Sequence, residues 1–94
     1  MFTHIVMWKF NSGVSDNKKT KMIRQLTSLK SSIPELIEIE VKLNRSDSKF
    51  SYDIILISKF SSFNEYKIYS NNSKHKEVVK FISSITEKKA VIDF

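Results

Sequence analysis

The two histidines of this chain are the residues whose side chains are best suited to proton transfer. His4 begins the β-branched and aromatic run His4–Phe10, where a polar side chain does not fit an apolar wall, and His75 is the only other histidine. A neutral imidazole in a pocket can take a proton from the carbon next to a carbonyl group. We therefore expect His4 and His75 to meet in the fold, with His75 as the candidate general base.

Each histidine also has a purely structural interpretation. His75 follows Asn71–Ser73, which can cap a new helix, and the positive end of a helix dipole disfavours imidazolium and so favours a base. Alternatively, the His75 ring bonds to a backbone carbonyl and holds a helix break. For His4 the alternatives are a pocket wall or an orienting group, and a strand-end histidine that neighbouring backbone satisfies.

Hydrophobic periodicity predicts the elements that must position these residues. The strands are expected at Thr3–Phe10, Leu36–Leu43, Ser51–Phe60 and Lys89–Phe94. A first helix is expected to begin after Ser15 or Asp16 and to run to about Ser31. A second helix is expected to start at the Ser62 capping box, to be interrupted at Asn71–Ser73 and to end near Ile85. The order β-α-β-β-α-β predicts an α+β, ferredoxin-like fold. Residues 1–94 then form one domain, with a four-stranded, mostly antiparallel sheet and both helices on one face.

This arrangement leaves the other face of the sheet uncovered. Alternation along the strands predicts that face to carry Ile5, Met7, Ile55, Ile57 and Val91, with Asp93 among the charged residues that frame it. An apolar patch of this kind is not expected to stay in water. The sequence therefore predicts a homodimer that packs sheet against sheet.

The helix-facing side of the sheet is the predicted wall of a pocket for a small apolar ligand. The residues expected to line it are His4, Val6, Trp8, Tyr52, Ile54 and Phe81. The aromatic side chains of Phe60 and Tyr66 could line the same pocket. The alternative is that these large side chains simply fill the core.

Composition narrows the function classes further. The 94 residues contain no cysteine, which excludes thiolate catalysis and cysteine-built metal sites, and no ligand-spaced motif is present, so neither a metal nor another cofactor is expected. Without a leader segment or an apolar run of about 20 residues, we expect a cytoplasmic protein that does not enter membranes.

The net charge of +6 raises the question of a nucleic-acid partner. Much of this charge lies on the solvated face of the first helix. RNA-recognition domains share the predicted element order, but the stretch Lys49–Ile54 lacks the glycine of their third-strand signature and contains Asp53. RNA binding is therefore a minor alternative, and no nucleic acid is expected.

Four stretches of the chain resemble the stress-responsive A/B barrel domain family: His4–Phe10, Ser51–Phe60, His75–Phe81 and Ala90–Phe94. The resemblance implies a small homodimer in which two ferredoxin-like protomers form an α/β barrel. Family members include plant stress-induced proteins, bacterial proteins of unknown role and a plant polyketide cyclase that closes a ring by aldol condensation. The resemblance therefore implies a polyketide-like ligand as one possibility.

The resemblance also implies roles for individual residues. The cyclase carries a helix motif Tyr-x-x-His-Pro-x-His, which this chain matches at Tyr69 and His75 but not at Asn72 or Ser73. His75 would then be the base, and Tyr69 would hydrogen-bond the developing enolate. Two functions stay open: a binding or stress-protective protein, which needs only the dimer and the cavity, and an aldol-type cyclase or lyase that works without a cofactor.

Overall fold

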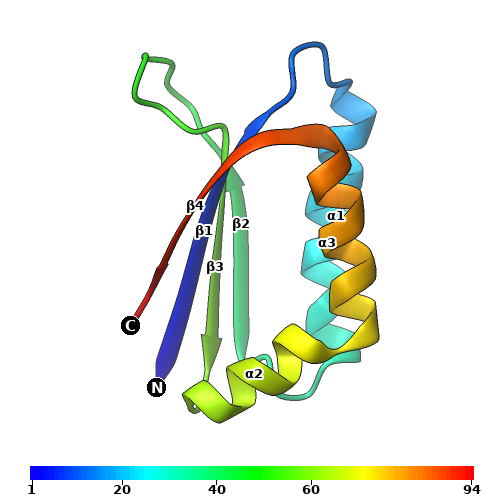
Figure 1. Ribbon diagram of the computed structural model, residues 1–94, viewed down its shortest axis with the longest axis vertical. Coiled ribbons are helices and arrows are strands. Elements are labelled where there is room, and N and C mark those ends of the chain that lie inside the picture. The colour runs from blue at the N-terminus through cyan, green and yellow to red at the C-terminus, as the bar shows by residue number, and fades with distance from the viewer.

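The computed structural model describes residues 1–94 as one helical layer on one antiparallel sheet (Figure 1). The elements in chain order are β1 (Phe2–Phe10), α1 (Asp16–Ser32), β2 (Glu38–Leu43), β3 (Ile54–Phe60), α2 (Phe63–Asn71), α3 (Ser73–Ile85) and β4 (Thr86–Asp93). The strand order is β2-β3-β1-β4, and each neighbouring pair is antiparallel. This confirms the expected fold, with β1 central and β2 at an edge.

Side-chain caps at the helix termini decide where the chain turns. Ser62 accepts a hydrogen bond from the Glu65 N–H, as its capping-box spacing predicts. The expected interruption falls at Asn72, which is extended, with φ −66° and ψ 136°, and accepts a bond from the Lys74 N–H. Asn72 thus ends α2 and begins α3. This sharp junction places His75 in the first turn of a new helix.

The core lies between the helices and the sheet face on which Val6, Trp8 and Phe10 alternate with less buried residues. The other buried hydrophobic residues are Met22, Leu26, Leu29, Ile33, Leu36, Ile54, Leu56, Phe60, Tyr69, Val78, Ile82 and Ile85. None of the helices combines the length and the apolar character that a membrane span requires.

The last strand corrects one expectation. β4 begins at Thr86, and its register pairs Val91 with Val6 and Asp93 with His4. Directly paired residues of antiparallel strands share a face, so Val91 and Asp93 face the helices, and their placement on the open face was wrong. Both alternating sets of this strand contain apolar residues, which is why the pattern alone does not fix its phase.

The open sheet face is nonetheless apolar at its centre. Ile5 pairs with both Ile57 and Ile92, and Met7 pairs with both Ile55 and Ala90. Ile92 is 61% exposed. Charged residues surround this centre, among them Lys59, whose Nζ lies 3.5 Å from Glu38 Oε2.

Tyr69 provides a test of the core. Its side chain has no exposed surface, and its hydroxyl has no hydrogen-bond partner. Because an unsatisfied buried polar group costs about 1–3 kcal/mol, we expect Tyr69→Phe to raise the free energy of unfolding by about 1 kcal/mol in chemical denaturation. Tyr66→Phe serves as the control and should give no such gain. A loss of stability in Tyr69→Phe would contradict this description of the hydroxyl.

Candidate functional site

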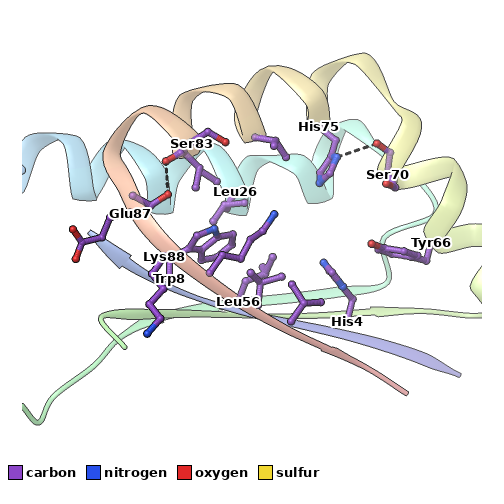
Figure 2. Close-up of a pocket in the computed structure, with 16 residues that line it drawn as sticks. His4, Trp8, Leu26, Leu56, Tyr66, Ser70, His75, Ser83, Glu87 and Lys88 are labelled. Carbon is purple, nitrogen blue, oxygen red and sulfur yellow. Dashed lines mark hydrogen bonds between the residues drawn. The ribbon is translucent and has the colours of Figure 1, made fainter. Parts of the chain in front are cut away.

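A pocket of about 450 Å³ lies between α3 and the sheet and reaches the end of α2 (Figure 2). Its volume falls in the range of small-molecule sites, roughly 300–1,000 Å³. Eight of the 16 lining residues are hydrophobic, and the full set is His4, Val6, Trp8, Leu26, Leu56, Tyr66, Ser70, His75, Val79, Ile82, Ser83, Thr86, Glu87, Lys88, Lys89 and Val91. The two histidines therefore share one cavity, as expected from the sequence.

His75 enters the pocket from the helical layer, and its ring is anchored by one nitrogen. Nδ1 lies 3.2 Å from the Ser70 carbonyl oxygen. A carbonyl only accepts, so Nδ1 donates, and in the neutral ring Nε2 carries the lone pair. The Tyr69 ring packs against the imidazole at 4.4 Å between centroids. Nδ1 thus makes the structural contact with Ser70, while Nε2 of the same ring stays available to take a proton.

Burial lowers the pKa of His75 below its ordinary value of 6.5. The hydrogen bond from the ring to the Ser70 carbonyl opposes this effect, and the nearby His4 adds to it. The imidazole is therefore neutral at pH 7. A neutral imidazole with a free Nε2 is the form that a general base needs.

His4 enters the same pocket from β1, opposite His75 (Figure 2). The ring is almost fully buried, and its Nδ1 lies 2.5 Å from Asp93 Oδ1 at the end of β4. Because a carboxylate accepts, Nδ1 donates, and Nε2 again remains available. On the neighbouring strand β3, the hydroxyl of the paired residue Ser58 donates to the His4 carbonyl oxygen over 3.1 Å. His4 is thus both a pocket wall and a group that the last strand orients.

Tyr66 contributes a phenol hydroxyl group to the pocket. Its ring lies 4.7 Å from the His4 ring between centroids. Burial raises the pKa of Tyr66 above 10.0, the negative charge of Asp93 raises it further, and the Ser70 side chain has the opposite effect. Tyr66 is therefore protonated at neutral pH, so its hydroxyl can donate to a ligand oxygen.

Only part of the predicted residue set comes together here. His4, Val6, Trp8 and His75 line the pocket. Four predicted residues lie elsewhere: Tyr69 and Ile54 are enclosed in the core, Phe81 packs against the core beneath Lys21 Nζ, and Tyr52 precedes β3 beside Met7 and Leu43. The pocket lies nearer to β4 than the sequence pattern indicated.

The roles of two groups in this site, Tyr66 and Asp93, did not follow from the sequence. Tyr66 lies one turn before Tyr69 on the same helix and occupies the place expected for Tyr69. Asp93 becomes a partner of His4 only through the pairing of β1 with β4. No cluster of three or more His, Cys, Asp or Glu side chains suited to a metal ion is found among residues 1–94.

Comparison with solved structures gives the fold independently. A dimeric protein of unknown function from Bacteroides fragilis is 25% identical, with a TM-score of 0.80, and the match covers 99% of this chain and 93% of that one. A protein from Arabidopsis thaliana is 23% identical, with a TM-score of 0.90 and coverage of 100% and 93%. A hydroxynitrile lyase from Passiflora edulis is 20% identical, with a TM-score of 0.90 and coverage of 99% and 90%.

A search of curated proteins gives no match. The model of one protein family, the stress responsive A/B barrel domain or Dabb, matches residues 2–94. The element order, the sheet topology and this match over nearly the whole chain agree. The chain therefore belongs to the stress responsive A/B barrel domain family.

Proposed function

We propose that the protein binds a small, largely apolar molecule in the pocket between α3 and the sheet. The observation that carries this proposal is the pocket itself, in which apolar walls from Val6, Trp8 and Val91 meet polar groups from two histidines. Ligand sites commonly combine an apolar lining with a few convergent polar groups of this kind. A molecule with an apolar body and a carbonyl oxygen matches both parts.

A second candidate function is proton abstraction from such a ligand, as in an aldol-type cyclase or a lyase. The specific observation in its favour is the neutral His75, anchored through Nδ1 with Nε2 left free. Tyr66, rather than Tyr69, would donate to the developing enolate oxygen. The Passiflora edulis protein of the same fold is a hydroxynitrile lyase, which supports lyase chemistry by analogy of fold.

We further propose that two copies associate through the open sheet face. The similar protein from Bacteroides fragilis is dimeric. In this chain the centre of that face is aliphatic, and a second sheet would remove Ile5, Met7 and Ile92 from water. At the centre of that face the strands present aliphatic side chains and no aromatic ring on which RNA bases could stack, and Tyr52 lies only at its margin beside Met7. The RNA-binding alternative therefore has less support.

Ligand binding can be tested with 2-octanone, an eight-carbon methyl ketone. We expect saturable binding by calorimetry, together with a change in the fluorescence of Trp8, the only tryptophan and a pocket residue. Val79→Phe places a larger side chain at the pocket wall and should weaken binding about tenfold, because overpacking displaces the ligand. Lys80→Phe, the neighbouring exposed position, should leave the affinity unchanged. Equal affinity in both variants would place the ligand elsewhere.

The base role of His75 can be tested by deuterium exchange at the carbon next to the carbonyl of 2-octanone in D₂O. Because a general base contributes about 10²–10⁴-fold, His75→Gln should slow the exchange at least 100-fold while ketone binding persists. The rate should reach a plateau as the pH rises and should fall as acid protonates Nε2, with a midpoint below 6.5 because burial lowers the pKa of His75. An unchanged rate in His75→Gln would rule out the base.

The dimer can be tested by sedimentation at micromolar concentration, where we expect about twice 11.0 kDa. Met7→Glu places an unpaired charge at the centre of the open face, so it should shift the protein to monomer. Thr20→Glu adds the same charge on the exposed side of α1 and should leave the dimer intact. A wild-type monomer would refute the sheet-to-sheet association.

A further inference from the structure

The pocket is polar at both ends and apolar between them. The residues of β4 that face the pocket follow the same order, from a charged residue through an apolar one to a second charged residue. Lys89 pairs with Trp8, Val91 with Val6 and Asp93 with His4, so these three residues of β4 lie on the pocket side of the sheet. The end near Asp93 holds the two histidines and Tyr66. The other end is lined by Lys89, Glu87 and Ser83, and we call it the mouth because all three of these residues are exposed to solvent.

The charged residues at the two ends of the pocket differ in whether they have an ion-pair partner within the protein. The Asp93 carboxylate already accepts from His4 Nδ1. The only other ion pair in the structure joins Lys59 to Glu38 on the open face of the sheet. Lys89 therefore has no carboxylate partner within ion-pair distance, even though Glu87 lies only two residues away. An ammonium without a protein partner at a pocket mouth is suited to an anionic group on a ligand.

The spacing of the two ends sets the size of such a ligand. Trp8 and His4 are four residues apart on β1, which corresponds to about 13 Å along a strand. Between them the lining is apolar, with Val6, Val91 and Leu56 as its main members. The flexible stem of Lys89 shortens the span between its ammonium and the histidines. A chain of roughly eight carbon atoms is therefore a suitable probe.

We propose that the pocket is selective for amphiphilic carboxylic acids, with the ligand carboxylate paired to Lys89 Nζ at the mouth. The apolar body then packs along Trp8 and Val91 toward His75. This inference rests on the proposed function, because it names the class of ligand for the same pocket. Since Lys89 is exposed to solvent, the contribution of this pair is modest, and about a fivefold preference for the anion is expected.

The experiment compares octanoate with octanamide, which has nearly the same shape but no charge. Calorimetry is run at low ionic strength and at pH 8, where an imidazole is ordinarily neutral. Wild-type protein should bind octanoate about fivefold more tightly than octanamide. Lys89→Met should bind the two equally, and Lys89→Arg should restore the preference. Lys80→Met is the matched control, because Lys80 is an exposed lysine of α3 that does not line the pocket.

The possible binding results separate three claims: selectivity for acids, the role of Lys89 and ligand binding in the pocket. Equal affinity of wild-type protein for octanoate and octanamide would overturn selectivity for acids and leave pocket binding standing. A preference for octanoate that survives in Lys89→Met, or that disappears in Lys80→Met as well, would overturn the role of Lys89. Failure of wild-type protein to bind octanoate, octanamide and 2-octanone alike would overturn the proposed function and this inference together.

Discussion

The pairing of β4 with β1 is the constraint on which the rest of the site depends. It places Val91 against the pocket wall, brings the Asp93 carboxylate to His4 and aligns Lys89 with Trp8 at the mouth. A shift of one residue would turn all three side chains to the open face of the sheet. The register of the last strand therefore sets both the composition of the pocket and the composition of the opposite surface.

The helical layer contributes the other half of the site through the junction at Asn72. The chain turns there between α2 and α3, so the Ser70 carbonyl at the end of one helix can accept from His75 in the first turn of the next. Both histidines are thus held by Nδ1, one by a backbone carbonyl and one by a carboxylate. An imidazole fixed in this way offers the same atom, Nε2, to a bound molecule.

Much of this architecture follows from local patterns in the sequence. The Ser62 capping box, the break at Asn71–Ser73 and the alternation along β1 each predict the element that the structure contains. The meeting of His4 with His75 also follows, since both lie on the buried sides of their elements. Local periodicity is sufficient for these features because each is decided within a few residues.

Two features required the tertiary structure. The phase of β4 is ambiguous because Val91 and Ile92 are both apolar, and only the partner strand decides between them. The choice between Tyr66 and Tyr69 depends on how α2 packs: Tyr69 lies against Phe60 with 4.9 Å between ring centroids, and Tyr66 lies beside His4.

The central claim is that His75 presents an unprotonated Nε2 to the pocket at neutral pH. The most direct measurement is a pH series of ¹⁵N spectra of the imidazole groups. We predict that the neutral His75 ring is protonated at Nδ1 and unprotonated at Nε2, with a titration midpoint below 6.5. A His75 ring protonated at Nε2, or a midpoint above 6.5, would contradict it.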